Sequence, residues 1–217
     1  MWGVAPFDNL NTKTKYKYIG RPKKIALPGD SWKKGELVRP LKVPKSLITD
    51  AVYLGDFGMA TEAGTEAREK VLSPMNTNYY APERFHNVNP SFASDMWSYM
   101  CLFSELYLGN VPWCSYSNMS MVTRMVGTLG SLPREWKGCY NGWGTSADWW
   151  YDHHRKPYPE ESLKSIIQTG RPEVGEVERN HIVSIMEKVF CYSPDKRSTA
   201  TELLQDPSFQ AVMEIYC

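Results

Sequence analysis

Apolar residues recur at helical spacing through much of the second half of the chain. Residues 92–108 are apolar on most sides of a helix, which predicts a helix buried inside a domain. Residues 119–129 and 177–190 space their apolar side chains three and four positions apart, and predict two more helices. Thr199 and Glu202 have the spacing of a capping box, which predicts the start of a last helix. The second half is therefore expected to be mainly helical.

The first half has shorter segments of a different character. Residues 51–54 form a short apolar run that ends at Gly55, which predicts a buried strand. Residues 14–27 alternate apolar and polar side chains, and predict a basic hairpin. Residues 31–46 are rich in Lys, Gly and Pro and are expected to be a loop. Residues 130–160 hold four tryptophans among several glycines and prolines, and are expected to be an irregular insert.

The composition indicates a folded protein with no membrane partner. Of the 217 residues, 42% are hydrophobic and 23% are charged, which excludes an intrinsically disordered chain. No apolar run approaches the roughly 18–20 residues of a membrane-spanning helix, and the N-terminus lacks the pattern of a secretory signal. The five cysteines are widely spaced, without a Cys-x-x-Cys pair, which disfavours a disulfide framework or a zinc site. We therefore expect an intracellular protein, in the cytoplasm or the nucleus.

Charge divides the chain into two parts. Residues 7–50 hold eleven Lys and Arg against four Asp and Glu, a net charge of +7. Residues 51–217 hold fourteen against twenty, a net charge of −6. We interpret residues 1–50 as a strand remnant followed by a basic insert. Aromatic residues within this insert leave nucleic-acid binding open as an alternative, but a solvated insert is the favoured interpretation.

Four motifs follow one another in the acidic part. Asp-Phe-Gly at 56–58 ends the predicted strand, and Ala-Pro-Glu occupies 81–83. Ser-Asp-Met-Trp-Ser at 94–98 opens the predicted buried helix, and Ser-Pro-Asp-Lys-Arg-Ser-Thr occupies 193–199. In this order and spacing the chain resembles the C-terminal lobe of eukaryotic protein kinases. The resemblance implies a mainly α (α+β) fold with a few short strands, formed by residues 51–217, and no N-terminal lobe.

The resemblance also implies roles for the Asp-Phe-Gly residues. Asp56 would bind Mg²⁺ and with it ATP, because phosphoryl transfer needs metal ions to neutralise the phosphates. Phe57 would pack between the lobes, and Gly58 would let the backbone turn. Without the resemblance, Asp56 is an ordinary turn residue after a strand.

Three further residues have structural roles in the resemblance. Glu83 and Arg197 would form a buried ion pair that ties the end of the activation segment to the helical core. Asp95 would hold the backbone of the catalytic loop. Its alternative role is that of a first-turn acid favoured by the helix dipole.

The activation segment would span residues 56–83. Its possible phosphorylation sites are Thr61, Thr65, Ser73 and Thr77. Tyr79 matches the usual tyrosine of the segment. Two positions depart from the family pattern: Asn76 stands where most kinases have Thr, and Tyr80 stands where the group of cyclin-dependent and SR-protein kinases has Arg.

A subgroup is indicated by residues 121–136, which end in Leu-Gly-Ser-Leu-Pro-Arg-Glu-Trp. This stretch, with the insert after it, is similar to that same group, and the chain looks most like a divergent relative of the SR-protein kinases. The resemblance implies a protein substrate, with Arg/Ser-rich sequences as the candidate class. Nucleic acid is disfavoured as a partner.

Several catalytic motifs of the family do not occur in the chain. It contains no Gly-x-Gly-x-x-Gly and no His-x-Asp-x-x-x-x-Asn, and its first histidine is His86. We therefore expect a truncated fragment of a Ser/Thr protein kinase, which lacks the catalytic base and is inactive as this chain alone. ATP and Mg²⁺ would be cofactors of full-length relatives. The alternative is a non-catalytic kinase-like interaction module. A metal site at His153 and His154 is disfavoured, because adjacent histidines do not face together on a helix.

Overall fold

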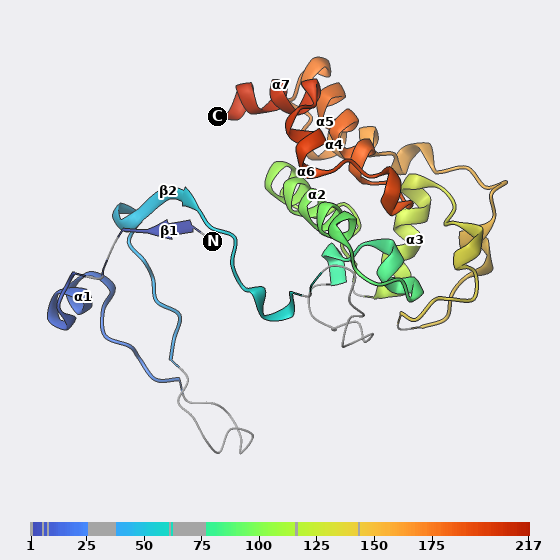
Figure 1. Ribbon diagram of the computed structural model, residues 1–217. Helices are drawn as coiled ribbons and strands as arrows, with labels where there is room; N and C mark the ends of the chain where they lie inside the picture. Colours follow the sequence, from blue (N-terminus) through green and yellow to red (C-terminus); the bar gives the residue numbers. More distant parts are fainter. Residues whose placement is uncertain are drawn as a thin grey trace. The chain divides into compact units, whose positions relative to one another are not determined.

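The computed structural model describes residues 2–5, 7, 9–25, 38–60, 62, 77–115, 117–142 and 144–217. They belong to two compact units, residues 1–60 and residues 61–217 (Figure 1). The division falls ten residues after the change in charge at residue 50.

The first unit is built on a two-stranded antiparallel sheet. β1 (Trp2–Val4) pairs with β2 (Ile48–Val52), with Val4 opposite Ile48. The Ala5 N–H donates to the Leu47 carbonyl at 2.7 Å and extends the pairing. Two 3-10 turns, η1 (Lys45–Leu47) and η2 (Phe57–Met59), flank β2. The chain between β1 and β2 therefore starts and ends at neighbouring strands of the same unit.

The prediction of a buried strand at 51–54 is wrong in both bounds and burial. β2 begins three residues earlier and ends at Val52, and the Leu54 side chain is 87% exposed. The strand is placed by backbone pairing with β1 and not by its apolar run. Among the described residues of this unit no second layer covers the two-stranded sheet, and four of the five residues of β2 are exposed.

The predicted hairpin over residues 14–27 is also wrong where the structure describes it. Thr12–Ile19 form a helix, α1. The Asn11 side chain accepts the Thr14 N–H at 2.9 Å, and Gly20 ends the helix with φ +75°. These two caps favour a helix, and they outweigh the alternation of tyrosines and polar residues that predicted a hairpin. Only Lys24 makes a strand-like contact, an isolated bridge to Val38, and residues 26–37 lie outside the described residues.

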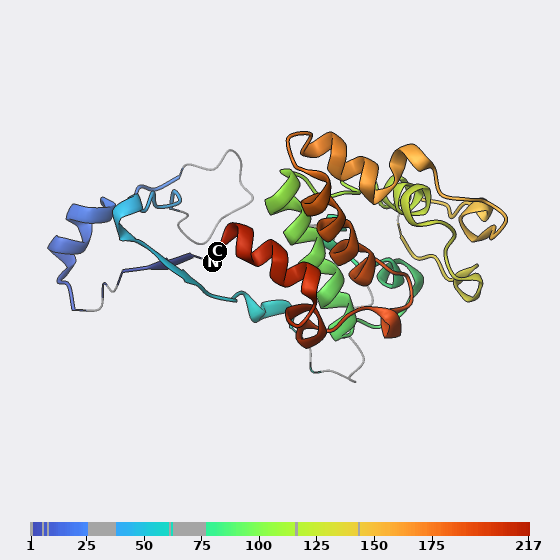
Figure 2. The same ribbon diagram turned by 90° about the horizontal axis from the view of Figure 1, so that it is seen from above.

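The second unit is mainly helical, as the apolar spacing predicted. α5 lies between α4 and α7 and also contacts α2 (Figures 1 and 2). Residues 92–108 form one helix with the predicted bounds. The helices are α2 (Phe92–Leu108), α3 (Asn118–Leu129), α4 (Leu163–Gly170), α5 (Glu176–Val189), α6 (Ala200–Leu204) and α7 (Pro207–Tyr216). The 3-10 turns are η3 (Thr77–Tyr79), η4 (Pro82–His86), η5 (Arg134–Trp136), η6 (Asp148–Tyr151), η7 (Pro159–Glu161) and η8 (Pro194–Lys196).

Helix α2 is buried on one side only. Trp97, Met100 and Cys101 are fully buried in the core, whereas Leu106 is 80% exposed. The expectation of a helix buried inside a domain is therefore met on one side of α2 and not on the other. The core of the second unit packs against one side of α2, and the apolar residues at Phe92, Leu102 and Leu106 lie outside it.

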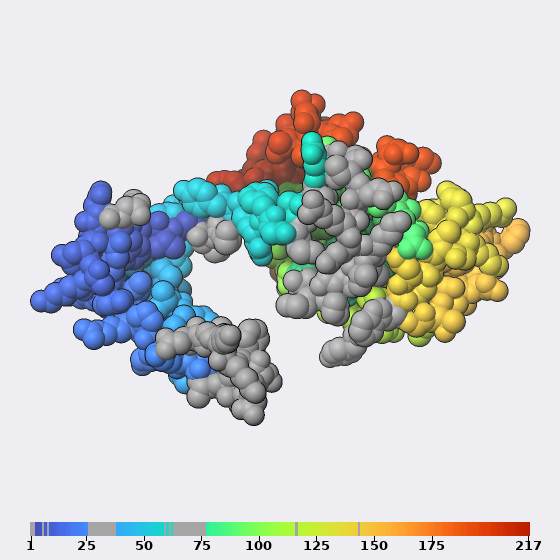
Figure 3. Space-filling view, turned by 60° about the horizontal axis from the view of Figure 1, so that its bottom comes forward, coloured from blue at the N-terminus to red at the C-terminus, as the bar shows by residue number. Residues whose placement is uncertain are grey.

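The insert at residues 130–160 is irregular, as predicted, but it belongs to the core. Its chain runs through three short 3-10 turns, and Leu132, Trp136 and Trp150 are buried. The Trp150 indole N–H donates to the Thr123 hydroxyl of α3 at 3.1 Å. In Figure 3 the insert, in yellow, is continuous with the rest of the second unit. Its aromatic residues therefore act as packing residues.

Substituting Trp150 tests whether the insert is part of the core. Trp150→Ala removes a fully buried indole, so we expect a loss of about 3–5 kcal/mol in the free energy of unfolding, measured by urea denaturation. Trp149→Ala, at the neighbouring half-buried position, is the matched control and should cost clearly less. Equal losses at the two positions would contradict a core role for Trp150.

Candidate functional site

The Asp-Phe-Gly segment turns sharply after β2 in the first unit. Asp56 has φ +65° and ψ +54°, in the left-handed region that few residues other than glycine adopt. Phe57–Met59 then form η2, closed by the Ala60 N–H on the Phe57 carbonyl at 3.0 Å. The left-handed residue is thus Asp56, whereas the resemblance to protein kinases predicted the turn at Gly58.

The Asp56 carboxylate is chemically suited to Mg²⁺. It is exposed and supplies the hard oxygen atoms that this ion prefers. The Phe57 side chain is 64% exposed. Among the described residues, no three His, Cys, Asp or Glu side chains gather into a metal site. Asp56 can therefore provide one ligand, and an ion bound there would take the others from water or nucleotide phosphates.

Glu83 and Arg197 form a buried ion pair in the second unit. Arg197 Nη1 donates to Glu83 Oε1 at 2.7 Å, and Nη2 donates to Oε2 at 2.6 Å. Both side chains are almost completely excluded from solvent. This two-bond geometry is the strongest that a guanidinium and a carboxylate can make. The expected contact between these residues, 114 positions apart in the sequence, is present.

The remaining N–H groups of Arg197 bind backbone carbonyls. Nε donates to Cys191 at 2.8 Å, Nη1 to Ala93 at 3.0 Å and Nη2 to Tyr192 at 3.3 Å. All five donors of the guanidinium thus have partners. The side chain connects the start of α2 with the segment that follows α5.

Helix α2 contributes two more contacts to the pair. The Ser94 hydroxyl donates to Glu83 Oε1 at 2.9 Å, and the Arg197 guanidinium lies 5.0 Å from the centre of the Trp97 ring. Ser94 is itself held in place at the start of the helix, because it forms a capping box with Ser91. The Ala-Pro-Glu segment is therefore fixed to the helix core by charge, hydrogen bonds and ring packing.

Asp95 lies in the first turn of α2 and is exposed. No hydrogen bond or ion pair joins its carboxylate to another described residue. Its position fits a first-turn acid stabilised by the helix dipole, and the predicted catalytic-loop contact stays a prediction.

The end of the predicted activation segment is anchored to α2. The Tyr79 hydroxyl donates to Glu105 Oε2 at 2.6 Å, and the Ser98 hydroxyl donates to the Tyr79 carbonyl at 2.8 Å. The hydrogen bond to Glu105 raises the pKa of Tyr79 to about 12. Thr77 is half-buried beside Tyr79 in η3. The other candidate phosphorylation sites, Thr61, Thr65 and Ser73, and the departure at Asn76 lie outside the described residues.

Tyr80 occupies the position where the similar kinase group has Arg. The Arg84 guanidinium lies 5.7 Å from the centre of the Tyr80 ring, and the Phe85 ring lies 6.2 Å away on η4. The Tyr80 ring therefore packs between Arg84 and Phe85, and Arg84 places a positive charge beside it.

His86 is a site residue whose role the sequence did not indicate. It is buried, its Nδ1 lies 2.8 Å from the Pro82 carbonyl, and its Nε2 lies 3.0 Å from the Tyr151 hydroxyl. The ring stacks on Trp136 of the insert at 4.9 Å. Burial lowers the pKa of His86, although the Pro82 carbonyl and Glu83 act in the opposite direction. The ring is therefore neutral, with Nδ1 donating to Pro82 and Nε2 accepting from Tyr151.

Comparison with known proteins decides the family. A family model described as protein kinase domain matches residues 39–209. The chain belongs to the protein kinase family. Full-length kinases use ATP and Mg²⁺, and the predicted kinase resemblance is confirmed.

Curated relatives resemble this kinase chain at low identity. Dual specificity protein kinase CLK2 of Homo sapiens is 28% identical over 210 residues, 93% of this chain and 40% of the relative. Glycogen synthase kinase 3 of Trypanosoma brucei brucei is 26% identical over 185 residues, 82% of this chain and 46% of the relative. Serine/threonine-protein kinase AFC2 of Arabidopsis thaliana is 23% identical over 180 residues, 77% and 40% of the two chains. This chain spans about 40% of the length of the first relatives.

Two other structural findings bear on the sequence predictions. Among the described residues, no helix is both long enough and apolar enough to cross a bilayer. The five cysteines are free thiols.

Removing Arg197 tests the buried pair. Arg197→Ala leaves the Glu83 carboxylate buried without its partner, so we expect a loss of about 3–5 kcal/mol in the free energy of unfolding. Lys196→Ala, at an exposed neighbouring position, removes the same charge and should change stability by less than about 1 kcal/mol. Urea denaturation of both variants checks this, and a similar small loss in each would contradict the role assigned to the pair.

His86 predicts a pH dependence of stability. The pKa of His86 is lowered in the folded chain, whereas in the unfolded chain it keeps its ordinary value of 6.5. Below that pH the unfolded chain binds a proton that the folded chain does not, so stability falls as the pH decreases toward the folded pKa. The free energy of unfolding should fall by up to about 1.4 kcal/mol per pH unit from this one residue.

The matched variant is His86→Gln, which keeps a donor and an acceptor but does not titrate. Its free energy of unfolding should decline less steeply between about pH 7 and pH 5 than that of the unchanged chain. Urea titrations at several pH values measure both slopes. Identical slopes would show that His86 does not carry this proton linkage.

Proposed function

We propose that residues 51–217 are the C-terminal lobe of a Ser/Thr protein kinase, and that residues 1–50 are a strand remnant with a basic insert. The observation that carries this proposal is the fully hydrogen-bonded Glu83–Arg197 pair at the two positions given by the kinase resemblance. Asp56 is the Mg²⁺–ATP ligand. The protein acts in the cytoplasm or the nucleus.

The chain of 217 residues is inactive by itself. Phosphoryl transfer depends on positioning the reactants and neutralising the charge of the phosphates. This chain brings one metal-binding carboxylate, Asp56, to that task. It contains no His-x-Asp-x-x-x-x-Asn sequence to supply a base and a second metal ligand, and no Gly-rich phosphate loop. A lone carboxylate holds Mg²⁺ weakly, because the ion needs phosphate co-ligands.

Glu105 supports a basic protein substrate, with Arg/Ser-rich sequences as the preferred class. Its Oε2 accepts the Tyr79 hydroxyl, and its Oε1 has no partner among the described residues. The carboxylate is half-buried beside the end of the activation segment. A half-buried carboxylate with a free oxygen suits a guanidinium, which donates two parallel hydrogen bonds. The net charge of −6 over residues 51–217 acts in the same direction.

A non-catalytic kinase-like interaction module is the second candidate function. The Glu83–Arg197 pair, which has a structural role, is complete. Of the residues that act in catalysis in the kinase family, the chain contains only Asp56. This difference favours the second candidate. In that case the helical surface would bind partners without transferring phosphate.

A phosphoryl-transfer assay tests the proposed inactivity. The 217-residue chain and its Asp56→Ala variant, incubated with radiolabelled ATP and an Arg/Ser-rich peptide, should both give no incorporation above background. Incorporation that Asp56→Ala abolishes would mean that another residue of this chain serves as base. If the reading frame before Met1 encodes His-x-Asp-x-x-x-x-Asn, the longer product should be active, and Asp56→Asn should lower its rate by about 100-fold or more. A longer product that carries the motif and stays inactive would favour the interaction module.

Glu105→Gln tests the proposed substrate class. Gln keeps the acceptor for the Tyr79 hydroxyl but loses the charge, so an Arg-rich peptide should bind about tenfold more weakly, as measured by fluorescence anisotropy. Glu214→Gln, at an exposed position of α7, removes the same charge elsewhere and should have little effect. A similar change in both variants would assign the binding to overall charge and not to Glu105.

A further inference from the structure

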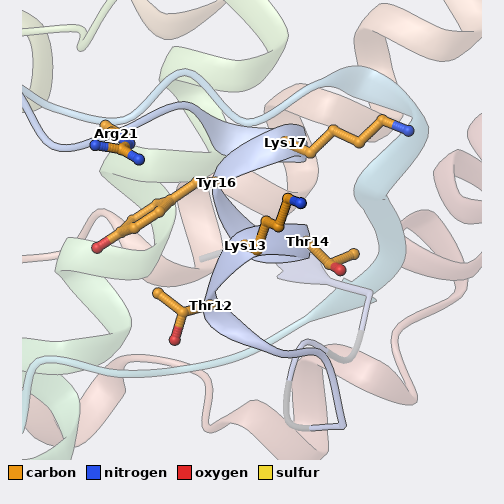
Figure 4. Close-up of a pocket in the computed structure, with 6 residues that line it drawn as sticks. All are labelled: Thr12, Lys13, Thr14, Tyr16, Lys17 and Arg21. Carbon is orange, nitrogen blue, oxygen red and sulfur yellow. The ribbon is translucent and has the colours of Figure 1, made fainter.

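The first unit carries a basic hollow on α1. It has a volume of about 740 Å³ and lies on one helix and the turn that follows (Figure 4). Its lining residues are Thr12, Lys13, Thr14, Tyr16, Lys17 and Arg21. We call this surface the basic hollow. Among the described residues that line it there are three positive charges and no carboxylate.

The fold explains only one charge of the basic hollow, since Lys17 lies in the last turn of α1, where the helix dipole favours a cation. Lys13 and Lys17 stand four positions apart on α1, where like charges cost about 0.2–0.5 kcal/mol in helix stability. The helix buries none of its residues and has no acid in its first turn. Within the part of the chain that the structure describes, neither lysine nor Arg21 forms a salt bridge. A negatively charged ligand would relieve this repulsion.

The charges are spread across the hollow. In Figure 4 the Lys17 side chain extends to one side of the helix, and Tyr16 and Arg21 lie together on the other side, with Lys13 between them. The Arg21 guanidinium lies 5.8 Å from the centre of the Tyr16 ring. Such an arrangement suits an extended ligand with several separate negative charges better than a single small anion.

The aromatic residues of α1 favour a peptide over a nucleic acid. Single-stranded nucleic acids bind by stacking their bases on free aromatic faces. Here Arg21 packs over the Tyr16 ring, and Tyr18 makes an edge contact with Phe7 at 6.4 Å. These contacts cover part of each ring and reduce the aromatic surface that is open to stacking bases, although Tyr16 and Tyr18 stay 37% and 49% exposed. Phosphoserine side chains need no stacking, and each brings about two negative charges and three oxygens that accept hydrogen bonds from Lys and Arg.

We propose that the basic hollow binds a peptide segment that carries several phosphoserines. The proposal stands apart from catalysis by this chain, because the hollow lies within the first unit and binding needs no turnover. In a Ser/Thr kinase such a site would hold a protein substrate that has already been phosphorylated.

Fluorescence anisotropy tests the proposal with the 217-residue chain and a short labelled peptide containing several phosphoserines, in about 0.1 M salt. The triple variant Lys13→Ala/Lys17→Ala/Arg21→Ala should bind the peptide at least about tenfold more weakly. The matched control, Arg39→Ala/Lys42→Ala/Lys45→Ala, removes the same charge from exposed positions of the same unit. It should stay within about twofold of the unchanged chain.

Two further ligands define the specificity. The same peptide with Glu in place of phosphoserine, and a single-stranded RNA of equal charge, should both bind more weakly than the phosphopeptide. The proposal is overturned if the phosphopeptide does not bind, if both triple variants lose affinity equally, or if the Glu peptide or the RNA binds as tightly. Because all six substituted side chains are exposed, the variants should keep the circular dichroism spectrum of the unchanged chain.

Discussion

The buried pair of Glu83 and Arg197 is the interaction on which the second unit depends. Taking two charges out of water costs several kcal/mol for each ion, and only good geometry with further hydrogen bonds offsets that cost. Both conditions hold here, since all five guanidinium donors are used and the carboxylate receives a third bond from Ser94. A structure that deviated in any one of the contributing segments would leave a charge without a partner. The pair therefore selects one arrangement of these segments more than it adds net stability.

A second connection holds the other end of η4. Glu83 joins this turn to α2 and to the segment before α6, whereas His86 joins it to the aromatic residues of the insert. The Asn141 N–H, which donates to the Phe85 carbonyl at 2.9 Å, adds a backbone link to the same insert. A turn of five residues is thus fixed from two sides by chemically different means, ionic on one side and aromatic on the other. This explains why an insert with little regular structure is nevertheless packed into the core.

The helices α2, α3, α5 and α6 could be predicted because their signals are local, whereas α4 and α7 were not predicted. Apolar spacing over residues 92–108 and the caps at Ser91 and Gly109 decide α2, and no distant contact is needed. The positions of β2 and the role of His86 were missed because distant partners decide them. β2 is placed by β1, at the other end of the unit, and His86 has its role from Tyr151, 65 positions later. For α1 the deciding signals are local, because Asn11 and Gly20 cap a helix and the alternating tyrosines between them do not prevent it.

Only part of the candidate site could be predicted from the sequence. Motif order was enough to pair Glu83 with Arg197, since the resemblance carries information about distant contacts that periodicity lacks. The backbone conformation at Asp56 was not accessible, because the sign of φ is no property of a residue type.

The left-handed backbone at Asp56 limits which amino acids this position can hold. A β-branched or bulky residue is disfavoured there whatever its chemistry, whereas Asn and Gly tolerate the conformation as Asp does. Two kinds of selection therefore act on one residue, the first for a carboxylate and the second for a permitted backbone. If the first were relaxed during evolution, the second would remain, and the position would drift toward Asn or Gly. A lineage that abandoned catalysis could in this way keep the turn after β2 unchanged.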